Sequence, residues 1–431
     1  MLKINPLSTL YVGIDVSSKS NYICALDFFK NKYINSSFAN NQPGAEELAL
    51  KILECLNQHP DLTMVVAALE STSVYSIHIA NYLSSCEELM RFKPYVFVLN
   101  PKCTANYKKS YIGLGKSDPI DAFVIADYAR AGNIESEPWR GSQFLALKRL
   151  TRHRLHLVEC MTREKTYLIS NLYLKFSELQ MLEGDDQPFC DIYGATSSSV
   201  LMEYLSPEEI LASSEENLIA FLAEKSCNRI KDISKTADLL KKAARDSYRL
   251  DKALYEPLNV SIASSFNCIE TFKREIKVID NAIEKEIKGL NPNAFIILQS
   301  IDGIGPVFAG GIIAEIGDIT AFHSSDALAK YAGLTWKSNQ SGDFYGEDTP
   351  MIKAGNRYLR YYLGEVANSM RKHNVEYGAY YRKKYNEVPK HQHKRALALT
   401  SRKFVRLVYG LLARNQLYSG VSLDTSIKDS N

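Results

Sequence analysis

The spacing of hydrophobic residues changes several times along the first hundred positions. Residues 11–16, 22–28 and 32–38 are rich in β-branched and aromatic types and are separated by Ser, Asn and Lys turns. This pattern is typical of an antiparallel meander. Residues 43–57 then carry apolar side chains at helical spacing, followed by an apolar run at 64–69, a helix-like segment at 74–83 and a strand-like run at 95–99. The pattern predicts an α/β domain, with the element order of the ribonuclease-H-like fold.

The rest of the chain predicts mostly helix. Leucine and methionine residues from Leu147 to Leu168 are spaced by threes, fours and sevens, and similar spacing returns at 236–288. We expect long helices that pair as a coiled coil, with an acidic, Ser-rich helical insertion near 184–235. Because 431 residues exceed one typical core, we predict an α/β domain at 1–135, a helical coiled-coil region at 136–294, a mostly helical C-terminal domain at 295–420 and a flexible tail at 421–431.

Charge is segregated along the chain, although the net charge is only +3. Residues 91–175 contain 15 Lys and Arg against 7 Asp and Glu, and residues 351–431 contain 16 against 5. A polyanion-binding surface requires such segregation, but solvated helix faces would give the same counts. The eight Cys lack zinc-ligand spacing, and no apolar run approaches the ~20 residues of a membrane span. We therefore expect reduced core thiols, a cytoplasmic protein and no membrane contact.

Two acidic residues interrupt apolar strands of the predicted sheet. Asp15 lies in the first strand, where Gly13 allows another backbone or a phosphate to come close, and Glu70 ends the fourth strand. In the ribonuclease-H-like order these two strands are neighbours. Both carboxylates would therefore project from adjacent strands.

A third acidic segment lies at 116–122. Ser117 or Asp118 can cap a helix there, Pro119 suits its first turn, and Asp118 and Asp121 share one helical face. Packed on the sheet, this helix would bring four carboxylates together, a cluster that hard divalent cations must neutralise. Two Mg²⁺ ions, or Mn²⁺ in their place, are the usual occupants in phosphoryl transfer. Taken singly, each acid is also explained as a cap, a first-turn acid or a strand-end residue.

Two further motifs lie beyond residue 295. The Gly303-Ile304-Gly305-Pro306 segment resembles the hairpin of a helix-hairpin-helix, whose backbone N–H groups can bind phosphate, although a plain helix–helix turn is the alternative. Ser341 precedes a Gly in a polar loop, with cations nearby at Lys353, Arg357 and Arg360. These are the ingredients of a serine nucleophile that attacks a phosphodiester, although an ordinary loop serine has the same surroundings.

Several motifs together carry a resemblance to a known family. They are Gly-Ile-Asp at 13–15, Leu-Glu-Ser-Thr at 69–72, Asn-Pro at 100–101, Lys-Ser-Asp-Pro-Ile-Asp-Ala at 116–122, Ser-Gly at 341–342, Lys-x-Gly-Asn at 353–356 and Arg-Lys at 402–403. With them the chain resembles the DEDD transposases of bacterial insertion sequences, the family that also holds the Piv-type DNA invertases. The chain departs from it in a long 184–235 segment and an acidic stretch at 342–348.

The resemblance implies a RuvC-like magnesium site at Asp15, Glu70, Asp118 and Asp121, and a covalent phosphoserine link at Ser341, with Ser338 as the less favoured alternative. It also implies homo-oligomers (dimer or tetramer) formed through the coiled coil, donor and target DNA as partners, and a structured guide RNA from the element's flank. The candidate nucleic-acid contacts are Lys116, Gly303, Gly305, Lys353, Arg357, Arg360, Arg402 and Lys403. We therefore expect an insertion-sequence transposase; a hydrolytic RuvC-like endonuclease and a non-catalytic nucleic-acid-binding protein are the alternatives.

Overall fold

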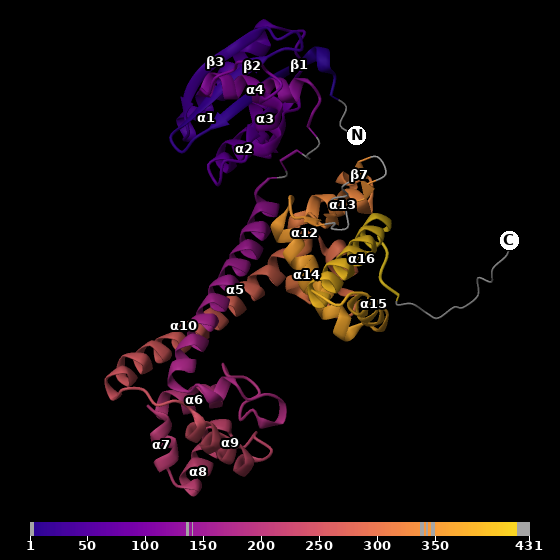
Figure 1. Ribbon diagram of the computed structural model, residues 1–431. Helices are drawn as coiled ribbons and strands as arrows, with labels where there is room; N and C mark the ends of the chain where they lie inside the picture. The colour runs from indigo at the N-terminus through magenta and orange to yellow at the C-terminus, as the bar shows by residue number, and fades with distance from the viewer. Residues whose placement is uncertain are drawn as a thin grey trace, which may run out of the picture. The chain divides into compact units, whose positions relative to one another are not determined.

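The computed structural model describes residues 4–134, 138–139, 141–336, 340–341, 344–345 and 350–419, with the backbone alone at 142–143, 340–341 and 344–345. The chain forms two compact units, one made of Met1–Ala146 with Ile313–Asn431 and the other of Leu147–Ile312 (Figure 1). Short 3-10 helices cover Pro6–Ser8, Glu87–Phe92, Glu178–Gln180, Gly184–Asp186 and Ile319–Ala321.

A five-stranded sheet in the order β3-β2-β1-β4-β5 forms the centre of the N-terminal α/β domain. β1 (Thr9–Val16), β2 (Ser20–Leu26) and β3 (Lys32–Ala39) form the predicted antiparallel meander. β4 (Met64–Glu70) runs parallel to β1, and β5 (Tyr95–Leu99) runs parallel to β4. The predicted pairing of the first strand with the fourth is confirmed.

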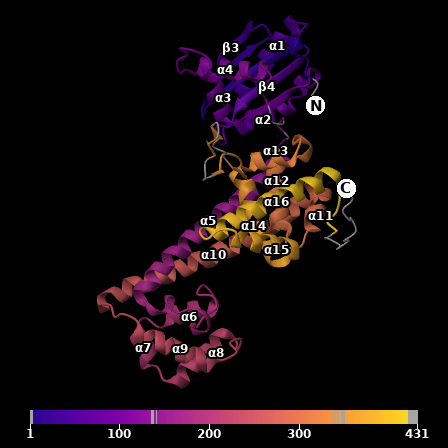
Figure 2. The same cartoon turned by 45° about the vertical axis from the view of Figure 1, so that its right-hand side comes forward.

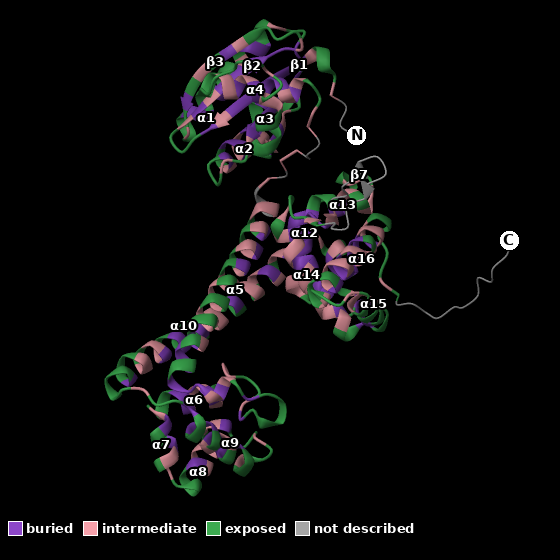
Figure 3. Ribbon diagram, in the orientation of Figure 1, coloured by how far each residue is buried: buried purple, intermediate pink, exposed green. Residues whose placement is uncertain are grey.

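Helices cover both faces of this sheet, and β1, β2 and β4 are mostly buried between them, whereas the edge strand β3 is partly exposed (Figure 3). α1 (Gln42–Gln58) and α2 (Ser76–Ser85) pack on one face, against Leu10, Val12 and Ile14 of β1. α4 (Asp118–Arg130) packs on the other face, against Tyr11 of β1 and Val66 of β4. Because successive strand residues point to opposite faces, the odd-numbered positions of β1 face α4.

A short helix that we did not predict, α3 (Pro101–Lys108), precedes α4. Asn100 begins it, since its side chain accepts a hydrogen bond from the backbone N–H of Lys102 and Pro101 occupies the first helical position. Only Thr104 of the eight residues is buried. The helix therefore lacks the apolar stripe from which helices are predicted.

Two long helices, α5 (Ser142–Lys175) and α10 (Lys252–Leu290), lie side by side in Figures 1 and 2, and an Arg154–Asp280 ion pair joins them. The helical spacing predicted at 236–288 belongs to two helices, because α9 (Ile233–Asp246) ends before α10 begins. The chain between them is diverted toward the end of α5, where Ser247 accepts from Glu178 and Tyr248 donates to Ser177.

The insertion is helical, as predicted. It contains α6 (Ala195–Glu203), α7 (Pro207–Ala212) and α8 (Glu215–Ser226), which pack with α9 around buried Val200, Ile210, Leu218, Leu222 and Leu240. Leu168 and Leu172 of α5 and Ile262 of α10 belong to the same core, so the insertion packs on the two long helices.

The remaining chain is mostly helical, as predicted. In order it forms α11 (Pro292–Gln299), α12 (Pro306–Ile316), α13 (Ser325–Ala332), β6 (Thr335–Trp336), β7 (Gln340–Ser341), β8 (Phe344–Tyr345), β9 (Met351–Ile352), α14 (Arg357–His373), α15 (Val375–Asn386) and α16 (Gln392–Arg414). Buried Leu359, Tyr362 and Val366 of α14 and Phe404 and Val408 of α16 belong to its core.

The expectation of core thiols is correct only for Cys24, Cys55 and Cys86. The other Cys residues are exposed or half-buried, because they lie in loops, at helix ends or on the outer sides of helices. Among the described residues, no helix combines the length and the apolar character that crossing a bilayer would require.

Candidate catalytic site

Asp15 and Glu70 lie at the ends of adjacent strands. They follow Ile14 and Leu69 directly, which are paired in the parallel β1–β4 ladder. Both occupy positions on the sheet face that α4 covers, as do Tyr11 and Ala68. The predicted projection of two carboxylates from neighbouring strands is therefore consistent with the register.

α4 crosses β1 directly over Gly13. A methyl group on Gly13 would lie 2.2 Å from the carbonyl oxygen of Ala122 and 2.3 Å from the amide nitrogen of Ala126. Only glycine permits so close an approach of the two backbones. The crossing brings the first turn of α4, with Asp118 and Asp121, toward Asp15.

The other three acids act electrostatically on Asp15. Burial, followed by repulsion from Asp121, Asp118 and Glu70, raises the pKa of Asp15 to about 6, against an opposing effect of Lys108. Within the described part of the chain, however, no three acidic, His or Cys side chains lie close enough together to hold one metal ion. The four acids are neighbours, but their side chains must move closer together to bind one metal ion.

The prediction that α4 begins at Ser117 or Asp118 is confirmed in position, but no side chain caps the helix. Ser117 is the N-cap residue but makes no side-chain capping hydrogen bond, and Asp118 is already the first helical residue. A residue with helical backbone angles cannot take the N-cap role, and the Asp121 N–H is satisfied by the carbonyl oxygen of Ser117. The Asp118 carboxylate is thus not committed to a cap.

Two residues of α3 that our sequence analysis missed contact this site. The hydroxyl of buried Thr104 donates to the Glu70 carboxylate, and the Lys108 ammonium pairs with the Asp121 carboxylate. Thr104 and Lys108 are four residues apart and thus lie on one helix face. The Asn100-Pro101 pair, which marks a helix start, is the sequence signal that could have placed them.

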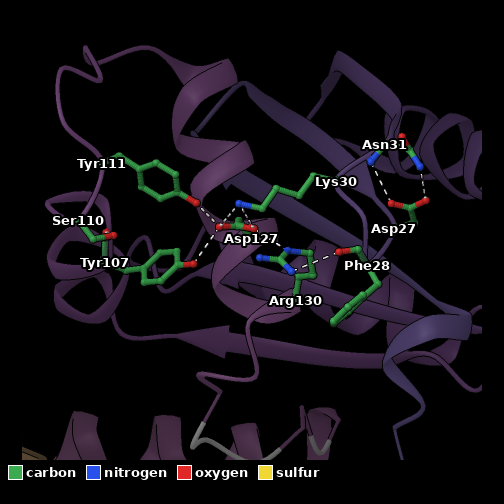
Figure 4. Close-up of polar contacts among 9 residues, drawn as sticks. All are labelled: Asp27, Phe28, Lys30, Asn31, Tyr107, Ser110, Tyr111, Asp127 and Arg130. Atoms are coloured by element: carbon green, nitrogen blue, oxygen red, sulfur yellow. Dashed lines mark hydrogen bonds and ion pairs between the residues drawn. The ribbon is translucent and has the colours of Figure 1, made fainter.

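Asp127, near the end of α4, is a third missed residue. Its carboxylate is completely buried and accepts from the hydroxyls of Tyr107 (2.8 Å) and Tyr111, and it pairs with Arg130 (2.6 Å) and Lys30 (3.2 Å) (Figure 4). Burial raises the pKa of Asp127, but its bonds with Tyr111, Arg130 and Tyr107 outweigh burial and hold the pKa below its usual range. Because Tyr107 and Tyr111 flank Lys108 in sequence, Asp127 anchors the segment that carries Lys108 to α4.

Asp127→Asn is expected to destabilise the N-terminal domain by about 3 kcal/mol, because it leaves the buried ends of Arg130 and two tyrosines without their charged partner. Urea unfolding can be followed by Trp139, which packs on the sheet core, in a Trp336→Phe background. Lys30→Met is the matched control and should change stability by less than about 1 kcal/mol, since the Lys30 side chain is 43% exposed. An unchanged urea midpoint for Asp127→Asn would contradict this role.

Gly333 and Gly355 lie close together at the two ends of the segment that contains the predicted serine, Ser341. β6 pairs with β9, and a methyl group on Gly355 would lie 2.6 Å from the Tyr331 carbonyl oxygen and 2.8 Å from the Gly333 nitrogen. Between these two glycines in the sequence, the backbone of Ser341 in β7 pairs with Phe344 of β8. The side chain of Ser341, and the alternative Ser338, lie outside the described residues.

Several predicted nucleic-acid contacts have protein partners. Arg360 donates to the Ala332 carbonyl oxygen (2.9 Å), Arg402 pairs with Asp326 and Lys403 pairs with Glu376. Lys116, Lys353 and Arg357 are exposed, and Gly303 and Gly305 lie in the turn between α11 and α12. Nucleic-acid binding by these residues stays a prediction.

Comparison with known proteins identifies the family. A family model described as "Transposase", of the DEDD type, matches residues 12–177, and one described as "Transposase IS116/IS110/IS902 family" matches residues 296–382. The chain belongs to the DEDD-type transposases of insertion sequences. Its family implies a requirement for divalent metal and DNA as a partner.

The transposase is similar to several curated proteins. It is 24% identical to the 42 kDa protein of insertion element IS900 of Mycobacterium paratuberculosis, over 95% of this chain and 97% of that protein. It is also 24% identical to the 44.8 kDa protein of IS116 of Streptomyces clavuligerus, over 95% and 96%. A pilin gene-inverting protein of Moraxella lacunata is 26% identical over 37% of this chain and 46% of its own length.

Proposed function

We propose that this transposase cuts and rejoins DNA at two sites, a Mg²⁺-dependent site at Asp15, Glu70, Asp118 and Asp121 in a ribonuclease-H-like domain, and a serine site at Ser341. The observation that carries the proposal is the placement of the four acids at the ends of β1 and β4 and in the first turn of α4, which crosses β1 at Gly13; repulsion by the other three acids adds to burial in raising the pKa of Asp15. Carboxylates that the fold holds close together repel one another when all are ionised. A bound cation removes this repulsion and so allows all of them to stay ionised.

The donor set fits magnesium. All four side chains offer carboxylate oxygens, the hard ligands that Mg²⁺ prefers, and two of them belong to the first turn of one helix. Bound ions would supply Lewis acidity toward the scissile phosphate and charge neutralisation in the transition state. Thr104 holds the Glu70 carboxylate in place for this purpose, and the close crossing at Gly13 holds Asp118 and Asp121 toward the strand ends.

The serine supplies the covalent chemistry. The Ser341 oxygen loses its proton and forms a bond to the scissile phosphorus, while the phosphorus–oxygen bond to the departing sugar breaks and that sugar oxygen takes up a proton. The phosphate is kept as a serine ester, so attack by another strand end can reverse the step without an external energy source. Exposed Lys353 and Arg357 are suited to hold the phosphates of the strand.

Further partners follow from surfaces of each unit. Exposed Arg382, Lys383, Lys390 and Lys394 surround the α15–α16 turn, which supports binding of the donor and target DNA and of a structured guide RNA.

An open groove along α10 is lined by Val260, Ala263 and Phe272, and Val260 is 67% exposed. This apolar face supports a homo-oligomer that forms through the long helices.

A covalent trapping assay tests the proposal. Labelled element-junction DNA and RNA from the element's flanks are incubated with the transposase and Mg²⁺ and are then resolved on a denaturing gel. The wild type and Ser338→Ala are expected to give a protein-linked DNA band, whereas Asp118→Ala and Ser341→Ala should give none. Cleaved DNA without an adduct, unchanged by Ser341→Ala, would instead make the protein a hydrolytic nuclease.

A further inference from the structure

Lys108 is a cation that lies beside two of the four acids, Asp121 and Asp15. Its ammonium is paired with Asp121, and the two side chains are only 22% and 24% exposed. Lys108 also acts on Asp15, since it opposes the repulsion that raises the pKa of Asp15. The acids of the site therefore have a protein cation among them when no metal ion is bound.

The position of Lys108 is fixed by its neighbours. Tyr107, immediately before it, donates to buried Asp127, and Tyr111 shortly after it donates to the same carboxylate (Figure 4). Four residues earlier on the same helix face, Thr104 donates to Glu70. α3 is thus held at Thr104 and again at Tyr107, the residue directly before Lys108, while Lys108 pairs with Asp121.

We propose that Lys108 is a positioning residue that acts as the internal counterion of the four acids and competes with divalent cations for Asp121. This inference rests on the proposed function, because it takes the acids to be the metal site. An ammonium and a metal ion cannot both occupy the same region of one carboxylate, so the Lys108–Asp121 pair must open as the ion binds. The pair therefore weakens metal binding and holds the acids together without metal.

The test is Mn²⁺ binding to the full chain, measured by titration calorimetry in the absence of DNA. Lys108→Met removes the charge and keeps the apolar stem, and it is expected to lower the dissociation constant for Mn²⁺ about fivefold, the order of effect of a partly exposed ion pair. Lys109→Met is the matched control, because Lys109 is exposed and its ammonium donates to Asn106, which is not one of the four acids. It should bind Mn²⁺ as the wild type does, and so should Lys108→Arg.

Thermal unfolding in EDTA gives a second readout that needs no metal. Lys108→Met is expected to unfold at a lower temperature than Lys109→Met, because the acids have lost their counterion. Equal or weaker Mn²⁺ binding by Lys108→Met, relative to Lys109→Met, would overturn the inference. The proposed metal site fails separately if Asp121→Asn binds Mn²⁺ as tightly as the wild type.

Discussion

Asp15→Asn is expected to slow Mg²⁺-dependent DNA cleavage by about 10³-fold and to stabilise the metal-free transposase at the same time. The loss of activity follows because metal assistance in phosphoryl transfer is worth several kcal/mol and ~1.4 kcal/mol corresponds to a factor of ten. The gain in stability follows from the pKa of Asp15, which burial and three neighbouring acids raise to about 6. One substitution at Asp15 would thus lower the cleavage activity and raise the stability.

The sign of the stability change depends on pH. Because its pKa is raised, folded Asp15 holds its proton more tightly than the unfolded chain does, so its contribution to stability is present at acidic pH and is lost as the pH rises through about 6. At pH 7.5 in EDTA, Asp15→Asn should therefore raise the free energy of unfolding by about 1 kcal/mol, allowing for partial exposure. The difference should shrink toward pH 4.

Urea unfolding at both pH values, followed by Trp139 fluorescence, measures this effect. Asp61→Asn, at an exposed acid of the same domain, is the control and should change neither stability nor cleavage. Adding Mn²⁺ should stabilise the wild type and not Asp15→Asn. A variant that is less stable than the wild type at pH 7.5 in EDTA would show that Asp15 is a structural residue.

The strand pattern was sufficient to place two of the four acids. Asp15 and Glu70 interrupt the apolar runs of β1 and β4, and the strand order of the predicted fold made these two strands neighbours, as their pairing shows. Helix-start signals at Pro119 placed Asp118 and Asp121 on the first turn of α4. What the sequence could not show is that, among the residues that the structure describes, the side chains do not preform an ion site.

The contacts around the acids depend on packing that local sequence does not encode. Thr104 and Glu70 are 34 positions apart, and α3 has too few apolar residues to be predicted as a helix. Asp127 interrupts an apolar helix just as Asp15 interrupts an apolar strand, so the same signal was present there and was not used. The two-residue strands β6 to β9 are too short for periodicity to detect.

Gly13→Ala is expected to destabilise the N-terminal domain by about 3 kcal/mol and to abolish stabilisation by Mn²⁺. The added methyl group would meet only backbone atoms, at 2.2 Å from Ala122 and 2.3 Å from Ala126, so no flexible side chain can yield to it. α4 must move away from β1, which exposes the apolar contact between them. The same movement carries Asp118 and Asp121 away from Asp15.

The matched control is Gly115→Ala, in the segment before α4, because a methyl group there would meet no atom within 4 Å. It should change stability by less than about 0.5 kcal/mol and leave the Mn²⁺ response intact. Gly13→Ala must lower both the free energy of unfolding and the stabilisation by Mn²⁺. Asp15→Asn lowers only the stabilisation by Mn²⁺. Comparing the two variants therefore separates the effect of where the acids lie from the effect of their charge. Wild-type stability and an intact Mn²⁺ response in Gly13→Ala would mean that the β1–α4 contact does not position the acids.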